Sequence, residues 1–237
     1  MEKIHLSFID STNAYLKNNY KELNNYTFVS TDEQSDGRGR NNRQWKSENG
    51  KNLLFSLLIL DKELIKHYKE ISIISAYSII EELKELGLKD ISIKWPNDVF
   101  VKDNKICGIL LESVTKNEME CLIVGIGLNV NQIDFNGEYI VEPSSIKKII
   151  NKDSDINLLK DRIYQRLIDN LEKLKEEYNF YSFIKELDYL KNKRVYADIN
   201  GCIKQVMVKG INEDYSLSIY NNDSLENIES GEISFHI

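Results

Sequence analysis

The stretch ISIKWPNDVFVKDNKICGILLESV, residues 91–114, contains three β-rich runs separated by turn residues. The runs cover 91–95, 98–101 and 105–114, and a fourth run, MECLIVGIGLNV, follows at 119–130. The Asp103-Asn104 pair suits a tight hairpin turn between the second and third runs. The pattern predicts a β-meander, in which each strand pairs with the next along the chain.

Two further strands are expected before the meander, at 26–31 (YTFVST) and at 52–60 (NLLFSLLIL). The second is apolar on both faces, as a buried strand would be. Between 63 and 86 apolar residues recur at spacings of three and four, and Gly87 stands where a C-cap glycine would. These features predict a helix packed on a sheet.

Helices are also expected nearer the two ends of the chain. Either Ser11 or Thr12 would serve as the N-cap of a short helix, and apolar residues from 159 to 178 mark a long amphipathic one. Beyond about 190 come the short strands RVYADI, CIKQVMVKGI, YSLSIY and EISFHI, with Asn200-Gly201 as a hairpin turn. We therefore expect an α+β fold, a mixed or antiparallel sheet packed by helices, with a small C-terminal β-barrel. The expected domains are 1–188 and 189–237.

Composition and charge exclude several classes of protein. The net charge of −7 over 237 residues argues against a protein whose main work is coating nucleic acid. The N-terminus has no apolar core of signal-peptide length, and no run approaches the roughly 20 apolar residues that span a bilayer. We expect a soluble, cytoplasmic protein that binds neither nucleic acid nor membrane.

Cysteine and histidine are few and scattered. Cys107, Cys121 and Cys202 match no metal or disulfide spacing, so buried free thiols are expected. The three histidines are equally dispersed, which argues against a histidine-built metal site.

A basic loop, GRGRNNRQW at 37–45, separates the two strands before the meander. Four basic residues and no acidic ones occur within 37–46, and the glycines would let backbone N–H groups approach a ligand closely. A carboxylate or a phosphate is the ligand that such a loop would bind. Taken alone, a solvated surface loop remains the commoner explanation, and an RNA-binding segment is a third.

Within the meander, the stretch KWPND (94–98) places a charged pair, an aromatic ring and an amide at a strand break imposed by proline. It is either a site that binds a ligand or a turn in which Asn97 and Asp98 bond their own backbone. Trp95 has core packing as its alternative role. Lys105 puts an ammonium group at the mouth of an apolar strand, and Gly108 leaves space where a side chain would stand.

The run GIGLNVN (125–131) is glycine-rich but does not match a nucleotide-binding loop. It lacks both a third spaced glycine and a following helix. Its glycines more plausibly thin a strand, so that a ligand or another backbone can lie against it.

In this order, DSTN (10–13), GRGRNNRQW (37–45), KWPNDV (94–99), K-x-x-GILLE (105–112) and GIGLNVN (125–131) closely resemble the biotin protein ligases. The resemblance implies a class II synthetase-like catalytic domain followed by an SH3-like C-terminal domain. It also implies a two-step reaction that uses ATP and Mg²⁺. Biotin becomes biotinyl-5′-AMP, and a lysine of a biotin carboxyl carrier protein domain then receives the biotinyl group.

The resemblance also assigns residues, position by position. Lys105 and Arg40 would be catalytic. Biotin would contact Ser11, Thr12, Asn13, Gln34, Gly37, Arg38, Gly39, Arg40, Lys105, Gly108 and Gly125. ATP would contact Arg38, Arg40, Arg43, Trp45, Asn97, Asp98, Lys105 and Asn129, while Gly127 would shape the pocket. The metal ligands are not assigned.

Two departures from the family pattern stand out. Asn42 occupies the second-glycine position of the usual GRGRxGRxW loop, although asparagine tolerates positive φ well. Only nine residues precede Asp10, so the N-terminal winged helix of some members, and with it a DNA-binding regulator, is not expected. A lipoate ligase and a non-catalytic biotin-responsive module are the alternatives, and a homodimer through an exposed sheet edge is possible.

Overall fold

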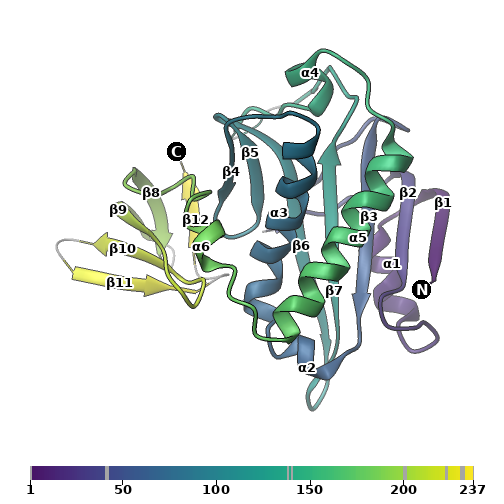
Figure 1. Ribbon diagram of the computed structural model, residues 1–237, viewed down its shortest axis with the longest axis horizontal. Helices are drawn as coiled ribbons and strands as arrows, with labels where there is room; N and C mark the ends of the chain where they lie inside the picture. The colour runs from purple at the N-terminus through teal and green to yellow at the C-terminus, as the bar shows by residue number, and fades with distance from the viewer. Residues whose placement is uncertain are drawn as a thin grey trace.

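A computed structural model describes residues 2–40, 43–137, 139, 141–199, 202–221, 224–229 and 233–236. Its centre is a seven-stranded mixed sheet in the order β1-β2-β3-β7-β6-β5-β4 (Figure 1). The strands are β1 (Lys3–Ile9), β2 (Phe28–Gln34), β3 (Asn52–Ile59), β4 (Ile91–Lys94), β5 (Asp98–Val101), β6 (Asn104–Thr115) and β7 (Met119–Asn129). β1 runs parallel to β2, and every other neighbouring pair is antiparallel.

The expected meander is confirmed, since β4, β5, β6 and β7 pair in chain order. The predicted hairpin turn was wrong by one residue. Val101 pairs with Asn104, so the turn is Lys102-Asp103, with Lys102 at φ 53°. The reason is a β-bulge next to Phe100, which shifts the register of the hairpin by one residue.

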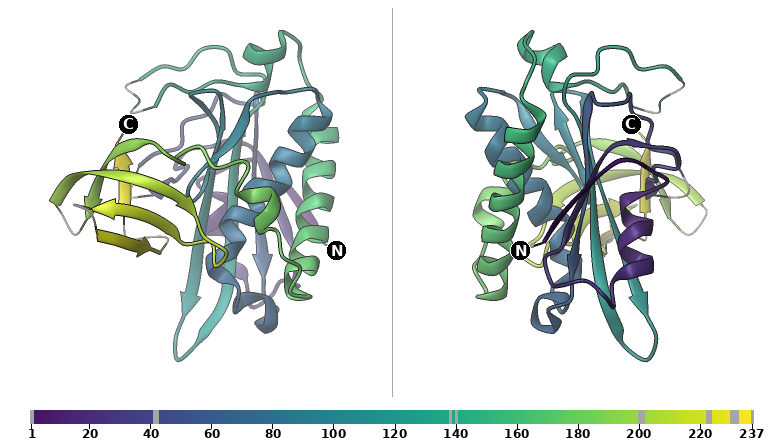
Figure 2. Two further views of the ribbon diagram at one scale, coloured as in Figure 1. Left: turned by 60° about the vertical axis from the view of Figure 1, so that its left-hand side comes forward. Right: turned by 90° about the vertical axis from the view of Figure 1, so that its right-hand side faces the viewer.

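Helices cover both faces of the sheet (Figure 2). They are α1 (Thr12–Asn19), α2 (Lys62–Ile65), α3 (Tyr68–Glu85), α4 (Ile146–Ile150), α5 (Ile156–Lys175) and α6 (Tyr181–Ile184). α3 and α5 lie on one face and share the main hydrophobic core with it, while α1 covers part of the opposite face over a small cluster around Leu16 and Val29. The two long helices appear where the apolar spacing predicts them. No helix among the described residues is long and apolar enough to cross a membrane.

The predicted helix ends have clear physical causes. Ser11 rather than Thr12 is the N-cap of α1, with its hydroxyl accepting from the Ala14 N–H at 3.4 Å. α3 ends at Glu85, and Gly87 follows its C-cap with a φ of +85°, which permits a Schellman motif. In that motif the Leu88 N–H donates to the Leu83 carbonyl at 3.1 Å.

A second, five-stranded antiparallel sheet follows in the order β11-β10-β9-β8-β12. Its strands are β8 (Arg194–Ile199), β9 (Cys202–Ile211), β10 (Leu217–Asn221), β11 (Ser224–Ile228) and β12 (Ile233–His236). It lies beside β4 (Figure 1), where the Trp95 indole N–H donates to the Tyr215 carbonyl at 2.9 Å. The α+β fold class is confirmed, and the boundary at 188/189 stays a prediction. The Asn200-Gly201 turn lies outside the described residues.

The cysteine prediction was partly wrong. Cys107 and Cys121 are buried free thiols, as expected, but Cys202 is exposed. It begins β9, and the first four residues of that strand are all exposed. Burial raises the pKa of the Cys107 thiol far above its ordinary value, which keeps it protonated.

Candidate active site

A cavity of about 540 Å³ opens on the α1 face of the seven-stranded sheet, beside α1 itself. It is lined by all of the residues assigned through the family resemblance except Gly37. The sequence analysis assigned no role to several others in its wall, of which Lys46 and Lys94 carry a charge. Motifs from residues 11 to 129 thus meet in one place.

The floor of the cavity is made of glycine. Gly108 of β6 and Gly127 of β7 are directly paired across the two strands, and the Trp45 indole lies over them. A Cβ at Gly127 would stand 2.5 Å from Trp45 Cε2, and a Cβ at Gly108 would stand 2.9 Å from Trp45 Cζ3. Both distances are too short for any side chain, so these glycines create the slot that holds the indole.

Gly125, two residues earlier on β7, makes a similar space for Asn13. A Cβ there would lie 2.3 Å from Asn13 Oδ1. The expectation that the glycines of GIGLNVN leave space beside the strand is therefore confirmed, but what occupies that space differs from the expectation. In this structure side chains from α1 and from the basic loop lie against the glycines.

The end of the cavity next to α1 is a buried hydrogen-bond network. The Thr12 N–H donates to Gln34 Oε1 at 2.8 Å, and Thr12 Oγ1 lies 2.7 Å from Ser56 Oγ. Ser56 Oγ in turn donates to Asn13 Oδ1 at 2.5 Å. Ser56 was not assigned from the sequence, because a serine within an apolar strand carries no motif.

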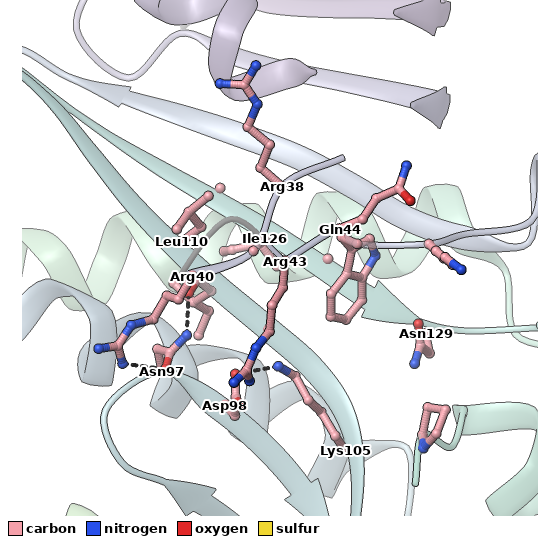
Figure 3. A pocket seen from close by; sticks show the side chains of 18 of the residues that line it. Arg38, Arg40, Arg43, Gln44, Asn97, Asp98, Lys105, Leu110, Ile126 and Asn129 are labelled. Carbon is pink, nitrogen blue, oxygen red and sulfur yellow. Dashed lines mark hydrogen bonds and ion pairs between the residues drawn. The ribbon is translucent and has the colours of Figure 1, made fainter. Parts of the chain in front are cut away.

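The opposite end is rich in cations (Figure 3). Lys105 Nζ forms an ion pair with Asp98 Oδ1 at 2.7 Å and lies 5.6 Å from the centre of the Trp45 ring. Figure 3 shows the Arg43 side chain pointing toward the same pair. Among the described residues that line the cavity, six are basic and one, Asp98, is acidic. Such an imbalance favours an anionic guest.

Asn97 connects the basic loop to the sheet. Its Nδ2 donates to the Ile109 carbonyl at 2.7 Å, and its Oδ1 accepts from Arg40 Nη1 at 3.1 Å. The alternative of a turn bonded to its own backbone is therefore wrong for this side chain, and Asp98 is committed to Lys105. Burial lowers the pKa of the Arg40 guanidinium below its ordinary value. Trp95, only 3% exposed, packs in the core as its alternative role supposed.

Lys94 is a charged residue that the sequence analysis did not assign to the site. It is 8% exposed, lines the cavity, and its Nζ lies 5.6 Å from the centre of the Phe100 ring. Burial lowers its pKa to about 8, opposed by the Asp98 carboxylate and assisted by Lys105 and Arg43. Its position directly before Trp95 in the KWPND stretch is the sequence feature that could have identified it as a site residue.

The basic loop folds back on itself as a tight hairpin. The Trp45 N–H donates to the Gly37 carbonyl at 2.8 Å, and the Gly39 N–H donates to the Arg43 carbonyl at 2.7 Å. A Cβ at Gly37 would come within 2.6 Å of the Trp45 carbonyl oxygen, so this glycine shapes the loop from behind the cavity wall. Asn42, the departure from the family pattern, lies outside the described residues.

Arg38 differs from the other loop arginines. Its guanidinium forms an ion pair with Asp36 at 2.8 Å, and Figure 3 shows its side chain pointing away from Asp98 and Lys105. More than half of the side chain is exposed. The Asp36 carboxylate raises the pKa of this guanidinium.

Three buried polar atoms on the cavity lining have no hydrogen-bond partner among the described residues. One, Asp98 Oδ1, is in the ion pair with Lys105, and the other two are Trp45 Nε1 and Asn129 Oδ1. Asn129 Nδ2 is held by the Ser144 carbonyl at 2.9 Å, which fixes the direction of the free oxygen. A buried donor and acceptor left open in this way are suited to a polar ligand.

Comparisons with known proteins agree with this geometry. The model of the biotin/lipoate A/B protein ligase family matches residues 6–129. Proteins described as "Bifunctional ligase/repressor BirA" from Bacillus subtilis and Escherichia coli are 31% and 33% identical over 133 and 126 residues. The matches cover 54% and 53% of this chain but 41% and 39% of the relatives, so the chain spans about two fifths of their length. The solved biotin protein ligase from Aquifex aeolicus, in complex with biotin and ATP, is 31% identical with a TM-score of 0.87. That alignment covers 99% of this chain and 98% of that one.

Proposed function

This chain belongs to the biotin/lipoate A/B protein ligase family, and from that premise we propose that it is a biotin–protein ligase. In the first step an oxygen of the biotin carboxylate attacks the α-phosphorus of ATP. The bond to the β-phosphate breaks, giving biotinyl-5′-AMP and pyrophosphate. In the second step a carrier lysine attacks the acyl carbon, loses a proton, and displaces AMP.

One observation carries the proposal: a single cavity has a neutral hydrogen-bonding end and a cation-rich end. The network of Thr12, Asn13 and Gln34 suits the ureido ring of biotin, whose N–H and C=O groups need fixed partners. The basic residues near Asp98, which include Lys94, Lys105 and Arg43, suit the place where a carboxylate meets a triphosphate. An enzyme that joins two anions needs both ends in one cavity.

Lys105 and Arg40 are the groups we assign to the reacting centre. Two anions repel each other strongly in a poorly hydrated site, and fixed cations offset that repulsion without reorganising. Lys105 is already oriented by Asp98 at 2.7 Å, and Arg40 by Asn97 at 3.1 Å. Both cations are therefore positioned before substrate arrives. Arg38, paired with Asp36, would have to turn inward to join them.

The donor set fits Mg²⁺ that is held chiefly by ATP. Mg²⁺ commonly binds one or two carboxylates together with substrate phosphates, and Asp98 is the carboxylate that would serve here. Among the described residues no three His, Cys, Asp or Glu side chains group together, so a site made wholly of protein ligands is not offered. The ion would offset the phosphate charge during adenylation.

For the adenine ring we assign Trp45 and Asn129. The indole lies on the glycine floor, which leaves its other face for stacking. Asn129 Oδ1 is a buried acceptor without a partner among the described residues, and it suits an exocyclic amino group. The acceptor of the second step would be a biotin carboxyl carrier domain.

The neighbouring candidate is a lipoate ligase, which would share the adenylation step. The buried network at the α1 end argues against it, because an apolar dithiolane would leave those polar groups without partners. A module that binds biotin without turnover is the other candidate. Lys105 and Arg40 are held by neighbouring residues, Asp98 and Asn97, in the wall of one cavity, and this arrangement of fixed cations favours catalysis.

The test is pyrophosphate release with ATP and MgCl₂, comparing biotin with lipoate. We expect release with biotin only, followed by avidin-detectable labelling of a biotin carboxyl carrier domain. The same carrier with its acceptor lysine changed to arginine is the matched control. Release with lipoate in preference to biotin would identify a lipoate ligase, and biotin binding without any pyrophosphate would identify a binding module.

A further inference from the structure

Glu112 of β6 does not line the cavity and is not among the residues that the family resemblance assigns to it, but it contacts Asn13, which does. Its Oε2 accepts from Asn13 Nδ2 at 2.8 Å, and its side chain is 22% exposed. Lys17 lies 3.7 Å from the same carboxylate. Asn13 itself is 4% exposed and continues into the buried network, so Glu112 stands at the open end of a chain of hydrogen bonds.

An ionised carboxylate can accept hydrogen bonds but cannot donate them. Asn13 must therefore turn its NH₂ group toward Glu112, because the opposite orientation would set two acceptors against each other. The Leu110 carbonyl, 3.5 Å from the same Nδ2, favours the same orientation. Asn13 Oδ1 consequently faces Ser56.

The direction of each following hydrogen bond is then determined. Ser56 has one hydroxyl hydrogen, and Asn13 Oδ1 takes it at 2.5 Å. Ser56 Oγ must then accept from Thr12 Oγ1, 2.7 Å away, because two hydroxyl oxygens this close need a hydrogen between them. Thr12 therefore donates its only hydroxyl hydrogen within this network. Toward a ligand, its hydroxyl oxygen can only accept a hydrogen bond.

Gln34 completes the pattern. Its Oε1 receives the Thr12 backbone N–H at 2.8 Å, so its NH₂ group is turned away from Thr12. Thr12 Oγ1 also lies within donating distance of Gln34 Oε1, at 3.1 Å, so the single Thr12 hydroxyl hydrogen is shared between two acceptors and none is left for a ligand. The end of the cavity next to α1 therefore presents an acceptor at Thr12, the complement of an N–H group of a cyclic urea.

We propose that Glu112 is a positioning residue that sets the hydrogen order of the Asn13–Ser56–Thr12 chain and thereby selects a ureido ligand. This inference rests on the proposed function, since it takes biotin as the occupant of that end. Glu112 acts through Asn13 and does not touch the ligand. The residue determines affinity for biotin and leaves the nucleotide end unchanged.

The test measures Kd for biotin and for ATP, by calorimetry on the whole chain, in three variants. Glu112→Met keeps the volume but removes the acceptor, and we expect Kd for biotin to rise about tenfold, the equivalent of one well-placed hydrogen bond. Glu112→Gln can still accept but can also donate, so its loss should be smaller, about threefold. Lys17→Met is the matched control, because it removes the neighbouring charge and leaves the Asn13–Ser56–Thr12 hydrogen-bond chain intact. It should match the wild-type chain, and ATP binding should not change in any variant.

A double-mutant cycle with Ser56→Ala distinguishes an effect through the Asn13–Ser56–Thr12 hydrogen-bond chain from a general structural effect. In that background the chain is cut between Asn13 and Thr12, so adding Glu112→Met should change Kd for biotin by less than about twofold. Desthiobiotin keeps the ureido ring and should lose affinity in parallel with biotin.

Three results would overturn the inference: wild-type biotin affinity in Glu112→Met, an equal loss in the Ser56→Ala background, or an equal loss of ATP affinity. A wild-type chain that binds no biotin at all would instead overturn the proposed function. Thermal unfolding of each variant confirms that it is folded.

Discussion

The buried Lys94 leads to a prediction about pH. Its pKa is lowered from 10.5 to about 8, mainly by burial at 8% exposure. Lys105, Arg43 and Lys193 lower it further, while Asp98 opposes them. Triphosphate bound at this end of the cavity would favour the charged form and raise the pKa again. Nucleotide binding should therefore take up a proton when the free chain has lost it.

The magnitude follows from the two pKa values. If bound phosphates restore the pKa to 10.5, the affinity for nucleotide should fall about tenfold between pH 7 and pH 9. The sign follows from the free state having the lower pKa. Affinity is full below pH 8 and is lost as pH rises through that value. At pH 9 binding should take up about 0.9 proton per site.

The assay is calorimetry with α,β-methylene-ATP in the presence of biotin, because the methylene bridge prevents adenylation. Measurements at pH 9 in two buffers of different ionisation enthalpy give the number of protons taken up. Lys94→Arg is the matched variant, since a guanidinium keeps its charge throughout this range. It should bind at pH 9 as well as at pH 7, whereas Lys94→Met should bind weakly at both.

The reasoning would be refuted by a wild-type affinity that is flat from pH 7 to pH 9. It would equally be refuted by a tenfold fall that persists in Lys94→Arg, because Lys94 would then not be the titrating group. A proton uptake near zero when nucleotide binds at pH 9 would show that the phosphates do not approach Lys94.

Three further predictions concern the cavity wall. Lys105→Ala should leave the fold intact yet lower pyrophosphate release by a factor of about 10² or more, because the lost charge faces developing negative charge; unchanged release would contradict its role. Arg40→Gly should release biotinyl-AMP faster, and retention at the wild-type rate would argue against that loop contact. Gly125→Ala should raise Kd for biotin, because its Cβ would meet Asn13 at 2.3 Å, while Gly127→Ala should raise Kd for nucleotide, because its Cβ would meet Trp45 at 2.5 Å. Equal effects of the two alanines on both ligands would contradict this division of the cavity.

The elements that repeat a strong local pattern were predictable from the sequence. The meander alternates turn residues with β-rich runs, and α3 and α5 follow helical spacing to within a few residues. β1 and β11 were not predicted. β1 pairs in parallel with β2 across α1, which no local signal encodes, and β11 reads SLENI, a run too polar to indicate a strand.

The site shows a similar limit. The residues assigned from the motifs line the cavity, apart from Gly37. Ser56 belongs to no motif, because a serine in an apolar strand is ordinary. Glu112 ends the K-x-x-GILLE motif, but a glutamate on a strand does not by itself indicate a role. Their contribution depends on which atoms face each other across β3, β6 and α1, at distances of 2.5 to 2.8 Å that only the folded chain defines.

The charged residues that line the cavity are mainly basic, whereas the chain as a whole has a net negative charge. The chain carries a net charge of −7, yet six basic residues and one acidic residue line this cavity among those the structure describes. Gathering cations around a lysine that is 8% exposed costs stability, and its lowered pKa is the evidence of that cost. A cluster of cations that lowers stability is arranged for function rather than for stability. Charges elsewhere on the surface are screened within about 8 Å at physiological ionic strength, so the local cluster, rather than the net charge, determines which anion binds.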